Sequence, residues 1–166
     1  MTYQKVDGTV LDLAPSSEAE RAYVQRVWEA YARGGGWEEV SEMVSGAGNP
    51  MLAPTGGIIT RDLYYSPAFQ AIRDVEDRAG MRDGSLLAAP DFDPEADPLA
   101  DEWIGTSDAA ARKGVTLPGL HAAIHRGVII ARPIRPGGTH LQVSVRSLER
   151  WAPSAVRQAA RRTVPR

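Results

Sequence analysis

Apolar residues first recur at helical spacing between residues 17 and 33. Ser17 and Glu20 stand at the spacing of a capping box, in which each side chain accepts a hydrogen bond from the other residue's backbone N–H. The apolar stripe that follows consists of Tyr23, Val24, Val27, Trp28 and Tyr31. This spacing predicts an amphipathic helix over 17–33, which the three glycines at 34–36 end.

A shorter pattern of the same kind predicts a second helix over 37–44, directly after the glycines. The residues expected to face the core are Trp37, Val40 and Val44. Aromatic residues in such a stripe belong mostly to a core, and the alternative is that part of this face binds a second copy or another protein.

Ser66 and Pro67 mark the start of a third helix, with serine as N-cap and proline in the first turn. Apolar residues then face inward as far as Gly80, where the helix is expected to end. Asp74 and Arg78 lie four residues apart and outside the apolar stripe. They are expected to form an ion pair on the solvated face, worth about 0.3 kcal/mol.

Two segments of the N-terminal half carry strand signals. Asp7-Gly8 is a turn signal between residues 3–6 and 9–13, which predicts an edge hairpin or a loose arm. Residues 58–60 combine two isoleucines with a threonine, and this composition indicates a short strand within a loop-like region.

Two short helices joined by a tight turn are predicted between Thr106 and Gly127. Thr106 or Ser107 provides the N-cap of the first helix, alanines fill it, and Gly114 ends it. Thr116 is placed to cap the second helix. The buried stripe of the second helix is Leu120, Ala123 and Ile124. Two helices and a short turn form the helix-turn-helix unit of many DNA-binding proteins.

A β-hairpin is predicted after these helices. Residues 129–134 and 139–145 can pair across a glycine-rich tip at 135–138. Apolar and polar residues alternate along the second strand, which gives one buried and one solvated face.

The stretch from Trp103 to Trp151 resembles the excisionase-type, MerR-like winged helix-turn-helix domain. The matching elements are Ala109-Ala110, Gly114-Val115, the helix over 116–126, Gly127, and Ser147-Leu148-Glu149-Arg150-Trp151. The resemblance covers roughly the last third of the chain. It implies that the second helix enters the major groove of DNA and that the hairpin, or wing, contacts the neighbouring backbone or minor groove.

By position, the resemblance implies three sets of DNA contacts. The major-groove set is Leu117, Gly119, His121, His125 and Arg126. The wing set is Arg132, Arg135 and His140, and the phosphate set is Arg112, Lys113, Thr116 and Arg146. Arg126 is the best candidate for a specific contact, because a guanidinium can bind guanine through two hydrogen bonds. For each histidine, the alternative is a surface residue with no special role.

Charge divides the chain at the same place as these patterns. Residues 1–102 hold 8 Lys and Arg against 19 Asp and Glu, a net charge of −11, whereas residues 103–166 hold 11 against 2, a net charge of +9. A basic segment beside an acidic one is typical of a DNA-binding module attached to a different module.

The predicted fold class is therefore mostly α with a small β-hairpin wing. The predicted parts are an acidic helical module at 1–87, an acidic proline-rich linker at 88–102, a winged helix-turn-helix domain at 103–152 and a basic tail at 153–166. The linker lacks the glycine and distal glutamate of a calcium loop, so no metal site is expected. An alternative role for this acidic segment is to fold back on the basic domain and compete with DNA.

Composition narrows the classes of protein further. Cysteine is absent, so disulfides and thiolate zinc sites are excluded. No long apolar run or signal-peptide pattern is present, and abundant Ala, Arg and Gly with little Lys fits a bacterial or phage source. A cytoplasmic, nucleoid-associated protein is expected. No nucleophile elbow or metalloprotease motif occurs, so neither an enzyme nor a cofactor is expected.

These patterns favour a sequence-specific, double-stranded DNA-binding protein that regulates transcription. We expect it to bind as a homodimer, with residues 16–80 used for self-association or for a protein partner. Two alternatives stay open. One is an excisionase-like architectural factor that bends DNA during recombination, and the other is an antitoxin-like protein whose N-terminal module neutralises a protein partner.

Overall fold

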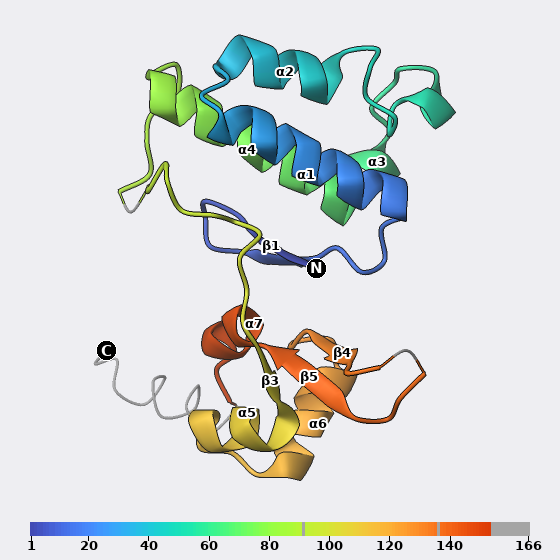
Figure 1. The fold of residues 1–166 in the computed structure, drawn as a ribbon, viewed down its shortest axis with the longest axis vertical. Coiled ribbons are helices and arrows are strands. Elements are labelled where there is room, and N and C mark those ends of the chain that lie inside the picture. Colours follow the sequence, from blue (N-terminus) through green and yellow to red (C-terminus); the bar gives the residue numbers. More distant parts are fainter. Residues whose placement is uncertain (91, 136, 154–166) are drawn as a thin grey trace, which may run out of the picture. The chain divides into compact units, whose positions relative to one another are not determined.

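The computed structural model describes residues 1–90, 92–135 and 137–153, and the chain divides into two compact units at Ala100 and Asp101 (Figure 1). The described residues form seven α-helices and two small antiparallel sheets, one in each unit. The fold is therefore mixed helical and β. The expectation of a mostly α chain with one hairpin was too narrow, because strands occur in both units.

The N-terminal unit begins with the expected hairpin. Strands β1 (Thr2–Gln4) and β2 (Val10–Asp12) pair antiparallel, with Tyr3 opposite Leu11. Gly8 adopts a φ of 79° in the turn, and the Asp7 carboxylate accepts a hydrogen bond from Thr9 N at 2.7 Å. The hairpin is anchored to the core of this unit, because the Tyr3 side chain packs there with no exposed surface.

Helix α1 (Glu18–Ala32) confirms the first amphipathic pattern. Ser17 is its N-cap, and the reciprocal bonds of a capping box to Glu20 are both present, at 2.6 and 3.2 Å. The residues of the stripe that are buried are Tyr23, Val24, Val27 and Tyr31. The helix ends at the cap residue Arg33, before the three glycines.

Helix α2 (Trp37–Ser45) confirms the second pattern, except at its first residue. Val40 and Val44 are buried as predicted, but Trp37 is 40% exposed. The prediction that Trp37 faces the core was wrong: it is the first residue of the helix and, unlike Val40 and Val44, stays partly exposed. A Cβ built on Gly80 would lie 3.3 Å from Trp37 Cδ1, so the ring rests against that glycine.

Residues 58–60 form no strand. They lead instead into the short helix α3 (Arg61–Tyr65), for which Thr60 is the N-cap. Ile58 is 67% and Ile59 43% exposed. The predicted strand was wrong because β propensity alone is not enough: among the described residues, no neighbouring strand pairs with this segment.

Helix α4 (Pro67–Asp83) is the centre of the N-terminal unit and packs against both α1 and α2 (Figure 1). It starts as predicted, with Ser66 as N-cap and proline in the first turn. It does not end at Gly80 but at Gly84, which adopts a left-handed φ of 83°. Gly80 serves packing instead, because a Cβ there would meet the side chain of Leu86 at 2.8 Å.

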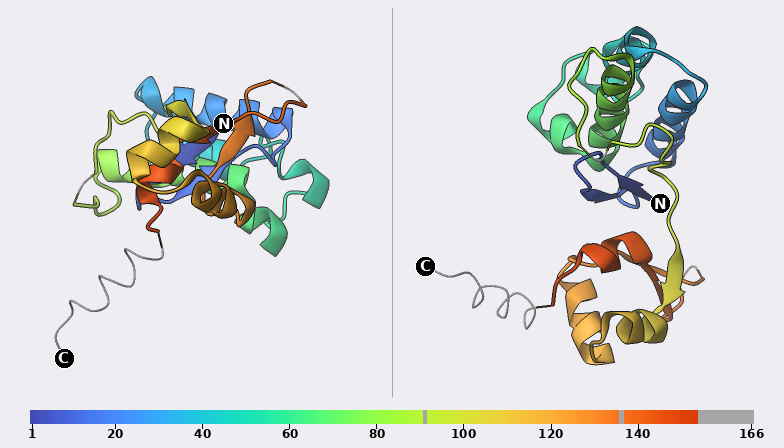
Figure 2. Two further views of the ribbon diagram at one scale, coloured as in Figure 1. Left: turned by 90° about the horizontal axis from the view of Figure 1, so that it is seen from below. Right: turned by 90° about the vertical axis from the view of Figure 1, so that its left-hand side faces the viewer.

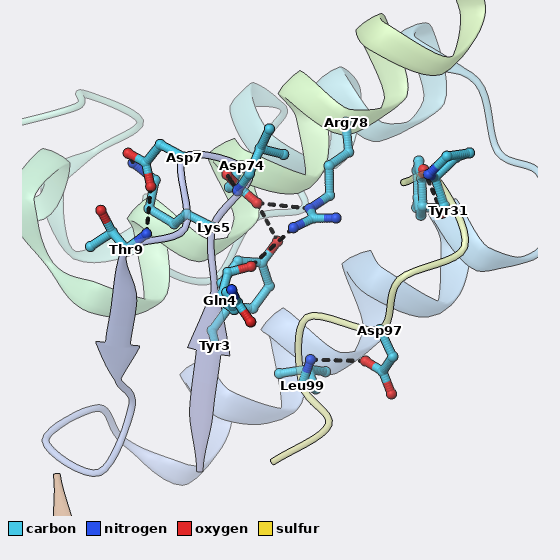
Figure 3. Close-up of polar contacts among 12 residues, drawn as sticks. Tyr3, Gln4, Lys5, Asp7, Thr9, Tyr31, Asp74, Arg78, Asp97 and Leu99 are labelled. Atoms are coloured by element: carbon cyan, nitrogen blue, oxygen red, sulfur yellow. Dashed lines mark hydrogen bonds and ion pairs between the residues drawn. The ribbon is translucent and has the colours of Figure 1, made fainter. Parts of the chain in front are cut away.

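Asp74 and Arg78 of α4 are buried, so their predicted place on a solvated face was wrong. Figure 3 shows their contacts with the N-terminal hairpin. Asp74 Oδ2 accepts hydrogen bonds from Tyr3 Oη and Arg78 Nε, both at 2.9 Å, and its Oδ1 accepts from Val6 N at 2.8 Å. Arg78 Nη2 donates to Gln4 O at 3.0 Å. The hairpin covers this side of α4 and converts a surface ion pair into a buried network.

This network predicts a loss of stability at high pH. Burial raises the pKa of Tyr3 well above its ordinary value of 10.0, and the Asp74 carboxylate raises it further. Because the folded state holds this proton more tightly, its stabilisation is complete below about pH 10 and is lost as the pH rises further. The free energy of unfolding from urea denaturation should fall above this pH by up to about 1.4 kcal/mol per pH unit for this group.

The control for that prediction is Tyr3→Phe, which should lose stability less steeply at the same pH values. Some slope should remain in this variant, because burial also raises the pKa values of Tyr23 and Tyr31. If the free energy of unfolding fell with pH equally steeply in the variant and the parent, the raised pKa of Tyr3 would not be the cause of the loss.

Residues 92–100 belong to the N-terminal unit and do not form a free linker. Tyr31 Oη donates to Pro94 O at 3.0 Å, and Gln4 N donates to Pro98 O at 2.9 Å. Leu99 packs against the core of this unit. The predicted linker at 88–102 is corrected accordingly, because carbonyl groups of this proline-rich segment provide acceptors for the unit.

The C-terminal unit contains a three-stranded sheet and three helices. Its elements are β3 (Trp103–Gly105), α5 (Thr106–Lys113), α6 (Leu117–His125), β4 (Ala131–Pro133), β5 (Leu141–Ser144) and α7 (Val145–Arg150). The strand order is β3-β5-β4, all antiparallel. Its core, separate from that of the other unit, is built mainly of Ala109, Leu120, Ile129, Val143 and Leu148.

Two further expectations concern the chain as a whole. In the described ranges, no helix has the length and apolar character needed to cross a membrane. Of the predicted basic tail at 153–166, residues 154–166 lie outside the described residues.

Candidate nucleic-acid interface

Gly114 and Thr116 shape the turn between α5 and α6. Gly114 adopts a left-handed φ of 65°, and Val115 N donates back to Ala110 O at 3.0 Å. Thr116 then caps α6 through its side chain, which accepts a hydrogen bond from Gly119 N at 3.3 Å. Both signals were read correctly from the sequence, because each acts within one turn of its helix.

Small side chains bring α5 and α6 close together. Ala109 of α5 and Ala123 of α6 both have no exposed surface. The start of α5 differs slightly from the prediction, because Gly105 rather than Thr106 or Ser107 occupies the N-cap position. The turn of chain between β3 and α5 is therefore tighter than expected.

The hairpin after α6 has the predicted pairing, with shorter strands. Arg132 of β4 stands opposite Gln142 of β5, and Ile134 N donates to His140 O at 2.9 Å. Strand β3 adds a third strand on the other side of β5, with Gly105 opposite Gln142. This strand was missed, because Trp103–Gly105 is too short to show alternation.

A groove with a volume of about 510 Å³ lies between the start of α5, α6 and the hairpin. Figure 2 shows these three elements from two further directions. The groove is lined by Gly105, Thr106, Ser107, Asp108, Leu117, His121, Ile134, Thr139, His140 and Leu141. It brings together three of the predicted DNA-contact residues, Leu117, His121 and His140, from parts of the chain that are separate in sequence.

Two predicted contact residues are exposed cations that do not line this groove. Arg126 is the C-cap of α6, and Arg135 follows β4 in the hairpin. Both side chains are exposed, and among the described residues neither has an ion-pair partner. His125 and Thr116 are also exposed, whereas Gly119 is half-buried in the first turn of α6.

Arg132, expected to contact DNA from the wing, stacks on Trp103. Its guanidinium carbon lies 4.0 Å from the centre of the ring. Trp103 pairs with Ser144 and Arg132 with Gln142, so both side chains lie on the face of the sheet opposite the buried Val143. Arg132 therefore contributes to the structure of the sheet as well as to its charge.

This stacking predicts a modest loss of stability in Arg132→Met, which keeps an aliphatic side chain and removes the charge. The free energy of unfolding of the C-terminal unit should fall by about 0.5–1 kcal/mol, the usual value for an exposed cation–π pair. Thermal denaturation followed by tryptophan fluorescence measures it. This loss of stability should vanish when Arg132→Met is made in a protein that already carries Trp103→Leu. An equal loss with and without Trp103 would contradict the stacking of Arg132 on Trp103.

Three of the predicted phosphate contacts are engaged elsewhere in the unit. Arg112 forms ion pairs with Glu149 at 2.5 Å and Glu102 at 3.6 Å, and Lys113 Nζ donates to Glu149 O at 2.8 Å. Arg146 is half-buried, and its backbone N donates to Asp101 Oδ1 at 3.3 Å. Arg112 and Lys113 connect α5 to α7, and none of the three lines the groove.

Sequence reasoning missed the other residues of the groove. Ile134, Thr139 and Leu141 were assigned only to the hairpin, and Ser107 and Asp108 only to the start of a helix. These residues line one groove only because of how the hairpin packs beside α6. The local sequence carries no signal for that packing. Among the described residues, no cluster of histidine and carboxylate groups could hold a metal ion.

Comparisons of the chain with protein-family models, with curated proteins and with solved structures gave no match.

Proposed function

We propose that the C-terminal unit is a winged helix-turn-helix domain that binds double-stranded DNA, and that the protein is a sequence-specific regulator of transcription. In this proposal α6 enters the major groove, where base pairs differ in their hydrogen-bonding edges. The β4–β5 hairpin is the wing, which contacts the DNA beside the site that α6 reads.

The observation that carries the proposal is the groove shared by α6 and the hairpin. Leu117 and His121 of α6 are one turn apart and face the same groove as His140 of the hairpin. A reading helix and a wing contact DNA together only if their outward faces lie side by side. The two small helices, the turn and the hairpin supply this arrangement on one rigid core.

The exposed cations support the proposal and suggest two roles. Arg126 stands at the end of α6, from which its guanidinium can reach a guanine edge and form two hydrogen bonds. Arg135 extends from the hairpin, where a cation contacts phosphates without reading sequence. Neither needs to leave an ion pair with a described residue before it binds.

One such domain covers only a few base pairs, so specific binding requires two copies. The N-terminal unit offers a surface for this association. Ile58 and Ile59 precede α3, and Tyr64 and Tyr65 end it, all with at least 43% of their surface exposed. Several exposed large apolar side chains on one short segment are typical of protein–protein contacts. We infer that the protein acts as a homodimer through this patch.

Selection from a pool of random-sequence duplexes tests the proposed function. Full-length protein should enrich one family of sequences, with two related half-sites if it binds as a dimer. A bound pool with the same sequence composition as the input would reject sequence-specific binding.

Two other functions make different predictions in the same experiment. An excisionase-like architectural factor should enrich several tandem sites and bend the DNA, rather than occupy one palindrome. An antitoxin-like protein should form a stable complex with a protein encoded beside it, and substitutions at Ile58 or Tyr65 should break that complex.

A further inference from the structure

We propose that the groove between α6 and the β4–β5 hairpin binds the methyl groups of thymine, so that the target carries thymine opposite Leu117. This inference rests on the proposed DNA binding and specifies what the groove recognises. It follows from the apolar side chains that line the groove and from the absence of lysine and arginine among its described lining residues.

Apolar side chains from both α6 and the hairpin line the groove. Leu117, the first residue of α6, is 40% exposed, and Ile134 of the hairpin is 53% exposed. Leu141 lies beside them. Exposed aliphatic side chains from both the reading helix and the wing gain free energy when a methyl group covers them.

The charges of the groove argue against a phosphate as its occupant. No lysine or arginine is among the described residues that line it, whereas the carboxylate of Asp108 is. A phosphate placed there would meet a negative charge and no cation. The exposed guanidinium group of Arg135 belongs to a residue outside the lining, so a phosphate has a binding partner there and the groove is left for a base edge.

The chemistry of the major groove identifies the base. Thymine is the only standard base that presents an aliphatic group in the major groove, its C5 methyl, and apolar side chains are its usual contacts. His121 lies one helical turn after Leu117 on the same face, so its ring can bond to the edge of a neighbouring base. The groove therefore combines an apolar pocket for a methyl group with adjacent polar contacts.

Replacing thymine by uracil tests this inference, because it removes only the methyl group. The duplex that full-length protein selects from the random pool is remade with uracil at one thymine at a time. The dissociation constant, measured by fluorescence anisotropy, should rise about fourfold at each contacted thymine, as expected for one buried methyl group. Leu117→Ala should bind the thymine duplex more weakly and should no longer distinguish it from the uracil duplex.

Val128→Ala is the matched control. Val128 is 46% exposed in the same unit but does not line the groove, so this variant should keep the parent's discrimination between thymine and uracil. If the selected duplex binds equally well with uracil at every position, the inference is overturned while DNA binding stands. If no duplex is selected, the proposed function fails together with it.

A protein occupant of the groove would give a third result. If a second copy of the chain covered Leu117 and Ile134, Leu117→Ala would change the mass measured by sedimentation without DNA. That outcome, with no effect of uracil, would assign the groove to self-association and overturn the inference.

Discussion

Replacement of Asp74 by alanine is expected to lower the free energy of unfolding of the N-terminal unit by about 3–5 kcal/mol. The side chains of Asp74 and Arg78 are 3% and 6% exposed. Without the carboxylate, the Arg78 guanidinium stays buried with no counter-charge, and Tyr3 Oη and Val6 N lose their acceptor. Urea denaturation followed by circular dichroism measures the loss.

Two further variants separate this effect from a general sensitivity of the unit. Glu38→Ala removes an exposed carboxylate and should change stability by less than about 0.5 kcal/mol. Asp74→Ala combined with Arg78→Met should be less destabilised than the sum of the two single changes, because no unpaired charge remains. A loss below about 1 kcal/mol in Asp74→Ala would contradict the buried network.

Arg126→Ala and Arg135→Ala are expected to weaken DNA binding in different ways. Arg126→Ala should cost about 1–3 kcal/mol on the selected duplex and relax the preference at one base pair, because it removes a contact to a base edge. Arg135→Ala should weaken binding to selected and scrambled duplexes alike. It should also reduce the slope of the logarithm of the binding constant against the logarithm of the salt concentration by about 1, because one fewer counterion is released. Fluorescence anisotropy at several salt concentrations measures both.

Arg150→Ala is the control for this pair of variants. Arg150 is an exposed cation in the last turn of α7 and does not line the groove. Its removal should change affinity less than either of the other substitutions. If Arg126→Ala and Arg135→Ala bind both duplexes like the parent, the proposed orientation of α6 and the hairpin on DNA is wrong.

Features that depend on neighbouring residues were predicted well from the sequence. The capping box at Ser17, the N-caps at Ser66 and Thr116, and the left-handed turn at Gly114 all act within one helical turn. The hairpin that follows α6 was likewise visible, because its two strands are separated only by a short glycine-rich tip.

Features that depend on tertiary contacts were predicted poorly. Asp74 has the spacing of a surface ion pair, yet the N-terminal hairpin, far away in sequence, buries it. Gly80 has the sequence signature of a helix end, yet it lies within α4, where the absence of a Cβ leaves room for the Leu86 side chain. The acidic segment before the C-terminal unit has the composition of a linker, yet its carbonyl groups bind Gln4 and Tyr31.

The candidate site shows the same division. Of the five α6 residues predicted to contact the major groove, Leu117 and His121 line the groove because they are one helical turn apart. Gly119, His125 and Arg126 do not line it. Arg112 and Lys113, which stay predicted phosphate contacts, also contact Glu149, and the sequence did not reveal this because it depends on how α7 packs beside α5. Ile134 and Leu141 line the groove only because the hairpin lies next to α6.

The central claim is that this protein binds duplex DNA and reads its sequence. The most direct test is an anisotropy titration of full-length protein against the random-sequence pool and the selected duplex, at low and near-physiological salt. Both should be bound at low salt, and the selected duplex alone should stay bound as salt rises, because phosphate contacts weaken with salt for every sequence and only base contacts distinguish the two. No binding to the random pool at low salt would contradict it.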